Sequence, residues 1–243
     1  MNIALPSPFT LVALDQVGST NDAARFRAAQ GSGHGLVVTA SEQSAGRGRR
    51  ARSWFSPRGN LHCSVLLDPG AQPARVAELA FVGAIALRDA LHSLVPTARL
   101  ACKWPNDILA DGAKVAGMLL ENAGALVIMG IGVNLIAAPM DTLYPAKSLS
   151  DYGGVITPET ALGPMIGGLD RWYRIWLRYG FPPIRKAWLD RADGLGGDVV
   201  VRLADSSTLT GSFADLDDHG ALLLDLPDGH RRRVLAGDVF FAA

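Results

Sequence analysis

The amino-acid sequence predicts an α+β protein in which a mixed β-sheet with helices is followed by a small C-terminal β domain. A strand signal, capping side chains and a helix open the chain, short strand signals separated by turns fill residues 100–135, and alternating β-like sequence follows a glycine cluster at 194–197. The 243 residues are 49% hydrophobic, which is enough for one large core and a small second domain. We therefore predict a main domain over residues 1–193 and a small β domain over residues 194–243.

The first part of the chain is expected to alternate strands and helices. The pattern predicts strands at 11–14, 36–40 and 61–67, a helix that ends near Gly31, and a long helix that ends near Leu94. Ser19, Thr20 and Asn21 can cap the first helix, and Pro73 fits the first turn of the second. Residues 43–53 lack hydrophobic periodicity and are dense in Arg, Gly and Ala, which predicts a mobile loop.

The rest of the chain combines an antiparallel meander, two helices and the β-like end. The expected features are hairpin corners at Asp111-Gly112 and Ala123-Gly124, a helix from Pro158 to Tyr179, a shorter helix from Pro183, and turns at 217–220 and 227–229. Thr157 can cap the first helix, and Gly180 lies just beyond its end. Trp172, Tyr173 and Trp176 are expected in the core. The final segment suffices for a small β-barrel that packs on the main domain.

Composition excludes several classes of partner. The 23 Lys and Arg residues balance the 23 Asp and Glu residues, so no bulk charge attracts the protein to nucleic acid or to an anionic membrane. Cys63 and Cys102 are too few for a disulfide framework, and neither they nor the histidines have ligand spacing, so we expect no tightly bound protein-ligated metal. We find no leader pattern and no membrane-spanning stretch. These features predict a cytoplasmic protein without membrane contact.

The segment GRGRRARSW at residues 46–54 places four arginines beside two glycines. Arginine can grip a phosphate or carboxylate group in two places, and glycine leaves the backbone free to close around a ligand. The segment therefore indicates an anion site. A solvated basic loop and a nucleic-acid-binding arm are the alternatives that the segment alone leaves open.

The segment KWPND at residues 103–107 gathers a lysine, an amide and a carboxylate around a proline. Asp107 beside Asn106 can help to hold Mg²⁺ together with substrate phosphates, and Lys103 can neutralise the charge that develops during nucleotidyl transfer. An ordinary turn with an exposed lysine explains the same segment equally well.

Two further segments fit a ligand site. Alternation along the strand after the first hairpin corner is expected to send Lys114, Ala116 and Met118 to one face, where small residues leave room for the lysine. A solvated edge lysine is the alternative. In GIGVNL, residues 130–135, the glycines permit close approach of a ligand and Asn134 can donate and accept hydrogen bonds. The glycine spacing excludes a dinucleotide-binding loop.

Taken together and in order, these segments resemble the biotin–protein ligase family. The order is Ser-Thr-Asn at 19–21, Gln43, the arginine segment, KWPND, KVAG at 114–117 and GIGVNL, and GALLLD at 220–225 is similar to the small terminal domain of that family. The resemblance covers nearly the whole chain. It implies a catalytic domain like that of class II aminoacyl-tRNA synthetases and a small C-terminal SH3-like β-barrel.

The resemblance implies a two-step reaction. Biotin is activated with ATP to biotinyl-5′-AMP, and biotin is then transferred to a lysine of the biotin carboxyl carrier domain of a carboxylase, with ATP and Mg²⁺ as co-substrates. A lipoate or octanoate ligase on the same fold is the nearest alternative. A nucleic-acid-binding module without enzymatic activity is the alternative from another class, and it predicts steeply salt-dependent binding without ATP consumption.

The same resemblance assigns expected roles to individual residues. Biotin contacts are expected from Ser19, Thr20, Asn21, Gln43, Gly46, Arg47, Gly48, Arg49, Lys114, Gly117 and Gly132. ATP contacts are expected from Arg49, Arg52, Trp54, Lys103, Asn106 and Asn134. Arg49, Lys103 and Lys114 are expected to act on the reacting groups, and Asp107 is expected to help Mg²⁺ directly or through water.

Some members of this family carry an N-terminal DNA-binding domain. Here the matching pattern already begins at Ser19, so we expect a ligase without sequence-specific DNA binding. Exposed strands of the meander would allow a symmetric homodimer, and a monomer is equally compatible with the sequence.

Overall fold

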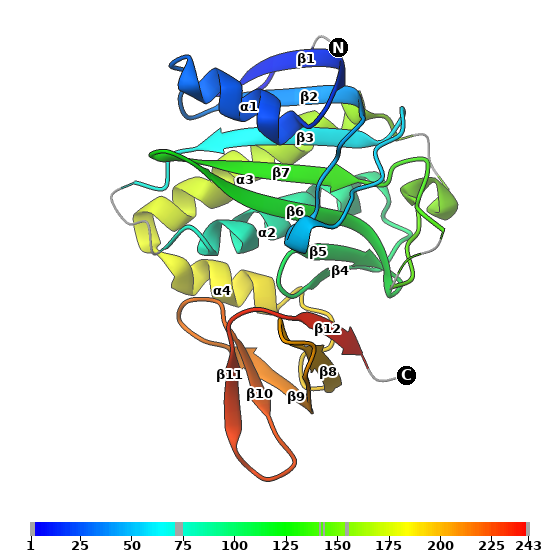
Figure 1. The fold of residues 1–243 in the computed structure, drawn as a ribbon, viewed down its shortest axis with the longest axis vertical. Coiled ribbons are helices and arrows are strands. Elements are labelled where there is room, and N and C mark those ends of the chain that lie inside the picture. Colours follow the sequence, from blue (N-terminus) through cyan, green and yellow to red (C-terminus); the bar gives the residue numbers. More distant parts are fainter. Residues whose placement is uncertain (1–2, 71–74, 141, 143, 154–155, 242–243) are drawn as a thin grey trace.

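A seven-stranded mixed sheet forms the centre of the computed structural model, which describes residues 3–70, 75–140, 142, 144–153 and 156–241 (Figure 1). The strands are β1 (Thr10–Val17), β2 (Leu36–Gln43), β3 (Leu61–Leu67), β4 (Leu100–Lys103), β5 (Asp107–Ala110), β6 (Ala113–Ala123) and β7 (Leu126–Val133). Their order in the sheet is β1-β2-β3-β7-β6-β5-β4. β1 and β2 run parallel and the other neighbours antiparallel, which confirms the predicted mixed sheet and its meander.

Helices cover the two faces of this sheet unequally. Alternate residues of the strands point to opposite faces, and Val37 and Val65 join the large core, whereas Val38 and Leu66 join a small cluster around Ala24. Ala24 belongs to α1 (Thr20–Ala29), which the Ser19 side chain caps as predicted. The helices α2 (Glu78–Leu94) and α3 (Pro158–Tyr179) pack together against the other face (Figure 1). The face beside α1 is therefore left partly open for a ligand.

The long helices follow the sequence signals closely. α2 ends at Leu94 as predicted, while the proposed place of Pro73 in its first turn lies outside the described residues. α3 has the predicted bounds, because Thr157 caps its first turn and Gly180, with φ 75°, ends it. Tyr173 and Trp176 are buried in the core, as expected, whereas Trp172 is only partly buried and packs against it. Among the described residues, no helix combines the length and apolar character needed to cross a membrane.

The chain then turns through α4 (Phe181–Leu189) into a second sheet. α4 begins two residues before the predicted start at Pro183, because Phe181 is buried against α2 and Pro182 also fits a first helical turn. The second sheet holds β8 (Asp198–Arg202), β9 (Thr208–Leu216), β10 (Leu222–Asp225), β11 (Arg231–Val234) and β12 (Asp238–Phe241), in the order β11-β10-β9-β8-β12. All of its pairings are antiparallel. This is the small C-terminal β domain that the sequence predicts.

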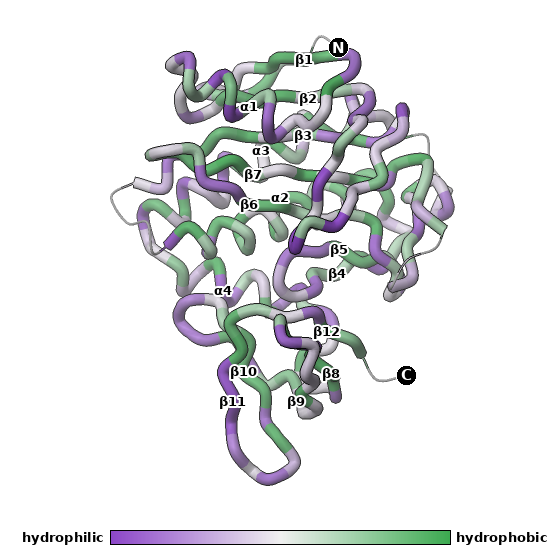
Figure 2. The backbone as a smooth tube through the Cα atoms, viewed as in Figure 1, coloured by the Kyte–Doolittle hydropathy of each residue, from purple (hydrophilic) through white to green (hydrophobic). Residues whose placement is uncertain are grey.

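The second sheet packs firmly on the main part of the chain. The predicted turns at 217–220 and 227–229 join its strands, and a further turn at 203–207 carried no recognised signal. Trp104 Nε1 donates a hydrogen bond to the backbone oxygen of Gly220 at 2.9 Å, and apolar side chains from both sheets meet in the large core. Figure 2 shows the contrast between hydrophobic β10 and hydrophilic β11 at the far edge. The proposed domain boundary after residue 193 remains a prediction.

Candidate active site

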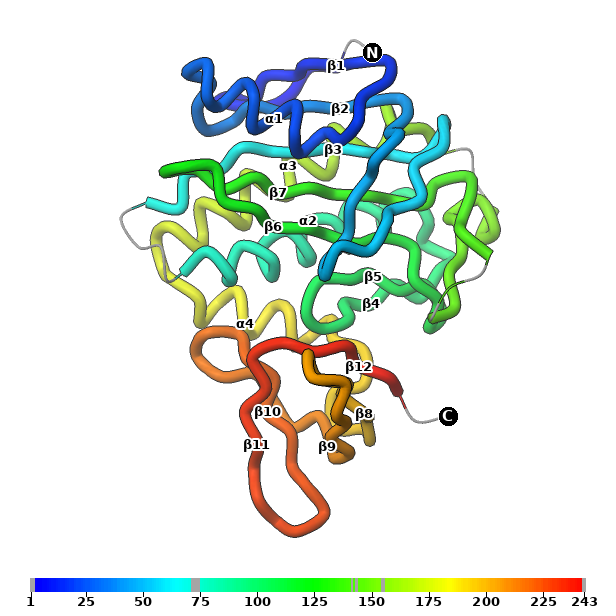
Figure 3. Tube along the Cα trace, viewed as in Figure 1, coloured from blue at the N-terminus to red at the C-terminus, as the bar shows by residue number. Residues whose placement is uncertain are grey.

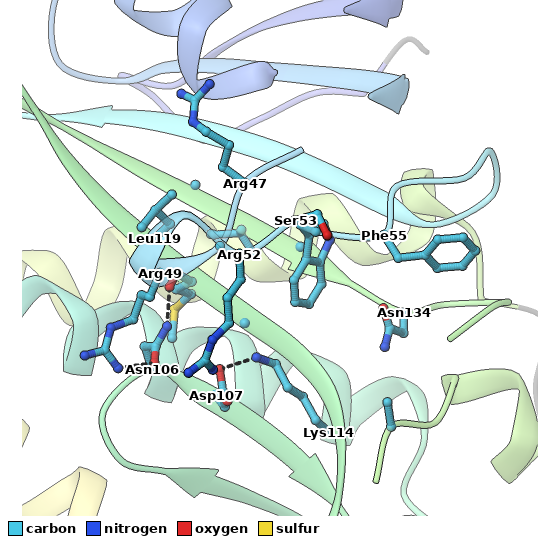
Figure 4. A pocket seen from close by; sticks show the side chains of 18 of the residues that line it. Arg47, Arg49, Arg52, Ser53, Phe55, Asn106, Asp107, Lys114, Leu119 and Asn134 are labelled. Carbon is cyan, nitrogen blue, oxygen red and sulfur yellow. Dashed lines mark hydrogen bonds and ion pairs between the residues drawn. The ribbon is translucent and has the colours of Figure 1, made fainter. Parts of the chain in front are cut away.

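One cavity of about 700 Å³ opens on the face of the large sheet beside α1 (Figure 4). The residues to which sequence analysis assigned roles line it with a single exception: Ser19, Thr20, Asn21, Gln43, Arg47, Gly48, Arg49, Arg52, Trp54, Lys103, Asn106, Asp107, Lys114, Gly117, Gly132 and Asn134. The exception is Gly46, which is buried and does not line the cavity. A Cβ atom at Gly46 would stand 2.7 Å from the backbone oxygen of Trp54, so glycine allows the two arms of the loop to meet.

The first turn of α1 builds an uncharged, polar end of the cavity. The backbone N–H of Thr20 donates to Gln43 Oε1 at 2.8 Å, which ties the helix to the end of β2. Ser64 Oγ donates to Asn21 Oδ1 at 2.6 Å, and Asn21 Nδ2 donates to Glu121 Oε2 at 2.9 Å. These bonds fix the Asn21 amide in one orientation, so this end of the cavity presents preset hydrogen-bonding groups to a neutral ligand.

Several members of this polar end escaped sequence analysis. Gln43 Nε2 donates to Ser56 Oγ at 2.9 Å, and Ser56 lines the cavity. Gly130 also lines it, and a Cβ atom there would stand 3.0 Å from Asn21 Cγ and closer still to Oδ1. Gly130 lies in the recognised GIGVNL segment, whose glycines were expected to permit close approach of a ligand, but no role was assigned to Gly130 itself. Ser56, Ser64 and Glu121 carried no local signal.

The arginine segment forms a hairpin-like strap across the cavity. In Figure 3 the chain leaves β2, crosses β3, β7 and β6 towards β5, and returns. The two arms are joined by Gly48 N–H to the oxygen of Arg52 at 2.7 Å and by Trp54 N–H to the oxygen of Gly46 at 2.9 Å. A short 3₁₀ turn, Arg49–Ala51, forms the tip, where Arg50 has φ 55°. The predicted loop is present with this added turn, while its mobility remains a prediction.

Carboxylates hold both ends of this strap. At one end Arg47 makes two hydrogen bonds of 2.6 Å to Asp22 in the first turn of α1, and Figure 4 shows Arg47 directed away from Lys114. At the tip, Arg50 donates to Asp238 Oδ2 at 3.1 Å, and Arg52 pairs with the same carboxylate. Because Asp238 belongs to β12, the small β domain contributes directly to the cavity wall.

Arg49 lies between these anchored ends and points into the cavity. Its Nη1 donates to Asn106 Oδ1 at 3.2 Å, and Asn106 Nδ2 donates in turn to the backbone oxygen of Met118 at 2.5 Å (Figure 4). Burial lowers the pKa of Arg49 from its ordinary value, although the group stays cationic at neutral pH. A half-buried guanidinium whose hydrogen-bond acceptor is only an amide is well placed to receive an anionic ligand.

Lys114 and Asp107 form an ion pair of 2.7 Å in the same wall. The structure corrects the predicted alternation here: Ala116 and Met118 face the core, whereas Lys114 lies on the cavity side with Gly117. The cause is a bulge in the pairing of β5 with β6, where Ile108 opposes Ala116 but Leu109 opposes Lys114. One extra residue shifts the side-chain alternation by one position.

Lys103 is the second lysine that lines the cavity, and it is buried. Its Nζ lies 3.7 Å from the centre of the Tyr144 ring, and Tyr144 stacks on Phe240 of β12 at 4.8 Å. Burial is the main cause that lowers the pKa of Lys103 to about 8; the charge of Asp107 opposes this shift, and the charge of Lys114 contributes to it. An incoming phosphate would restore the charge that burial disfavours. Tyr144 and Asp238 are site residues that no sequence motif indicated.

Trp54 closes the cavity over the end of β7. A Cβ atom at Gly132 would stand 2.6 Å from Trp54 Cζ2, so the indole ring packs directly on the glycine backbone. Lys114 Nζ lies 5.3 Å from the centre of the same ring. Asn134 stands next to this contact, and its backbone N–H donates to the oxygen of Val115 at 2.8 Å, which fixes the end of the strand. The tryptophan thus shields the neighbourhood of Lys114 from water.

The cavity joins neutral hydrogen-bonding groups at one end to two lysines and an arginine at the other. This arrangement suits an enzyme that holds a small polar carboxylic acid against a phosphate-bearing co-substrate, because the cations offset the repulsion between two anions. Fold and site together therefore define the class of carboxylate-activating ligases.

Comparison with known proteins identifies the family. Residues 14–134 match the model of the biotin/lipoate A/B protein ligase family, and residues 194–242 match the biotin protein ligase C-terminal domain. The biotin–[acetyl-CoA-carboxylase] ligase of Paracoccus denitrificans is 41% identical over 94% of this chain and 99% of that protein. The ligase of the same name from Mycobacterium tuberculosis is 34% identical over 92% of this chain and 86% of its own length. The chain belongs to the biotin protein ligase family.

A solved structure shows the same fold. The biotin protein ligase from Aquifex aeolicus in complex with biotin and ATP superimposes with a TM-score of 0.84 at 24% identity, covering 96% of this chain and 98% of that one. The likeness extends over both sheets, which agrees with the predicted catalytic fold followed by a small β domain.

Proposed function

We infer that this protein activates biotin with ATP to biotinyl-5′-AMP and then transfers biotin to a lysine of the biotin carboxyl carrier domain of a carboxylase. The observation that carries this inference is the single cavity in which the neutral end at Asn21 meets the cationic end at Lys103 and Lys114. The match of residues 194–242 to the biotin protein ligase C-terminal domain favours biotin over lipoate as the acid.

In the first step, a carboxylate oxygen of biotin attacks the α-phosphorus of ATP, the bond from that phosphorus to the bridging oxygen breaks, and pyrophosphate leaves. Lys114 and Arg49 stand where the two anions must meet, and their charges stabilise the transition state more than the separated reactants. In the second step, the carrier lysine attacks the acyl carbon, loses a proton, and displaces AMP. Closure by the arginine strap and Trp54 protects the mixed anhydride from water between the steps.

Individual roles follow the position of each residue along the cavity. We propose that Ser19, Thr20, Asn21 and Gln43 hold the biotin ring end, with Gly117 and Gly132 giving the ligand close approach to the sheet. Arg52, Lys103, Asn106 and Asn134, with Trp54, are proposed to bind the nucleotide.

The residues of the cavity fit Mg²⁺ only as an ion that is bound together with ATP. No group of three or more His, Cys, Asp or Glu side chains in the described part of the chain could hold a metal ion. Asp107 lines the cavity and lies beside Lys114, and Mg²⁺ commonly binds one or two carboxylates together with substrate phosphates. Asp107 would therefore take one coordination position, directly or through water, and the bound ion would neutralise phosphate charge.

A pyrophosphate-release assay with ATP, Mg²⁺ and either biotin or lipoate tests the proposed function. We expect biotin-dependent release and, after addition of a carrier domain, a mass increase of one biotinyl group. Release with lipoate alone would replace biotin by lipoate as the substrate. Release with neither acid would contradict a ligase activity for this cavity.

The balanced charge of the chain also argues against sequence-specific DNA binding. We propose that the arginine strap serves the ligand cavity alone, because its arginines are held by Asp22, Asp238 and Asn106. Specific operator binding in a gel-shift experiment at physiological salt would contradict this proposal.

The pH dependence of kcat/KM for ATP should reflect the ionisation of the buried Lys103. The pKa of Lys103 lies near 8 in the free enzyme instead of 10.5, so kcat/KM for ATP should fall above about pH 8 as the charge is lost. In Lys103→Arg the cation persists at every accessible pH, and this alkaline limb should disappear. The unfolded chain keeps the lysine proton up to a pKa of 10.5, so folding stability should rise between pH 8 and 10.5. An unchanged limb in Lys103→Arg would assign it to another group.

A further inference from the structure

Asp22 stands outside every recognised motif, yet it joins the arginine strap to the first turn of α1. Its two carboxylate oxygens each accept a hydrogen bond of 2.6 Å from the guanidinium of Arg47. The hydrogen bonds from Arg47 lower the pKa of Asp22, and those to Asp22 raise the pKa of Arg47. Two parallel hydrogen bonds between a guanidinium and a carboxylate strengthen the contact and also fix the relative orientation of the two groups.

Neighbouring groups reinforce the pair. Glu121 of β6 lies 3.5 Å from Arg47 Nη2 and also accepts hydrogen bonds from Asn21 and Arg25. The Arg47 guanidinium is thus engaged by two carboxylates. It is directed away from Lys114, where the acid and the phosphate would react (Figure 4).

The backbone transmits this anchor to the rest of the strap. Arg47 is paired with Ser53 across the hairpin, and Gly48 is bonded to Arg52, so the two arms move as one piece. Arg49, which points into the cavity, follows Arg47 by two residues. Loss of the Asp22 contact would leave this end of the strap without its bidentate anchor, while the tip would remain attached to Asp238.

We propose that Asp22 is a positioning residue that holds the arginine strap closed over the biotin end of the cavity through Arg47. By keeping the strap in place, this pair slows the escape of the adenylate. The part concerning the adenylate rests on the proposed function, whereas the closure of the strap does not.

The expected size of the effect is modest. The side chains of Asp22 and Arg47 are 53% and 36% exposed, and water screens such pairs. Exposed pairs contribute at most about 1 kcal/mol, which corresponds to about a fivefold change in an opening equilibrium. Asp22 lies in the first turn of α1, where Ser19 supplies the cap, so Asp22→Asn should keep the helix folded.

Limited trypsin digestion tests closure without any need for activity. The strap offers cleavage sites after Arg49, Arg50 and Arg52, and none of them is altered by Asp22→Asn. We expect cleavage within the strap to be about fivefold faster in Asp22→Asn than in the wild type. Asp22→Glu should restore the rate to within about twofold, because the carboxylate is kept.

Asp15→Asn is the matched control. Arg58 donates to the two oxygens of Asp15 at 2.7 and 3.0 Å, so the pair has the same bidentate form, but neither residue lines the cavity. This variant should leave strap cleavage at the wild-type rate. Equal rates in Asp22→Asn and Asp15→Asn would overturn the proposal.

A chase experiment tests whether the protein retains the adenylate: labelled biotinyl-AMP is formed on the enzyme, and its release is followed after addition of excess unlabelled biotin and ATP. Asp22→Asn should release the adenylate about fivefold faster, with kcat for its formation changed by less than about twofold. Faster cleavage without faster release would overturn the role in retention. A wild-type protein that forms no adenylate would refute the proposed function, and the trypsin result would still decide whether Asp22 closes the strap.

Discussion

Lys114→Met should lower kcat for pyrophosphate release by about 100- to 1,000-fold while leaving biotin binding nearly unchanged. Removing one preorganised donor from a site of developing charge typically has an effect of about this size. Lys114 pairs with Asp107 at 2.7 Å, so its loss also leaves a mostly buried carboxylate beside the incoming phosphates. Repulsion between anions then adds to the barrier.

Lys147→Met is the matched control for this prediction. Lys147 is exposed, its Nζ lies 5.4 Å from the Tyr152 ring, and it does not line the cavity, although its backbone is bonded to that of Lys114. It should keep wild-type kcat. Pyrophosphate release under saturating substrates gives kcat, and calorimetric titration with biotin gives the affinity. A decrease of less than about threefold for Lys114→Met would remove Lys114 from the reacting groups.

The contrast between these two lysines shows what sequence reasoning can and cannot resolve. KVAG placed Lys114 at the site by resemblance, but simple alternation grouped it with Ala116 and Met118 on the wrong face. The bulge that redirects it arises from the pairing of β6 with β5, and nothing in residues 113–118 marks a bulge. Local sequence sets the strand, and the partner strand sets which way each side chain points.

The helix and turn signals were more reliable because their causes are local. α3 has the predicted bounds since a threonine cap and a glycine stop lie directly before and after it. The corners at Asp111-Gly112 and Gly124 likewise depend on residues that tolerate positive φ, here 46°, 79° and 67°.

The carboxylates that anchor the strap could not be predicted in the same way. Asp22 and Arg47 are separated by 25 positions, and Arg50 and Asp238 by 188. Each carboxylate lies in an ordinary surface pattern of its own helix or strand. Only the packing of α1 and β12 around the strap turns them into parts of the site.

Gly130→Ala should raise KM for biotin by about 5- to 150-fold with a smaller effect on kcat. The new Cβ atom would stand 3.0 Å from Asn21 Cγ and closer to Oδ1, so the amide must move. Asn21 is almost fully buried, and moving it breaks the bonds from Ser64 and to Glu121. Leaving such groups unpaired costs about 1–3 kcal/mol, which corresponds to this range of KM.

Gly167→Ala separates this steric effect from a general effect of replacing glycine. Gly167 lies within α3, has no heavy atom within 4 Å of an added Cβ, and is remote from the cavity wall. Alanine there should raise the free energy of unfolding by about 0.5–1 kcal/mol and leave KM unchanged. If Gly130→Ala also keeps the wild-type KM for biotin, Asn21 does not hold the biotin ring end, and the neutral part of the cavity must bind another portion of the substrates.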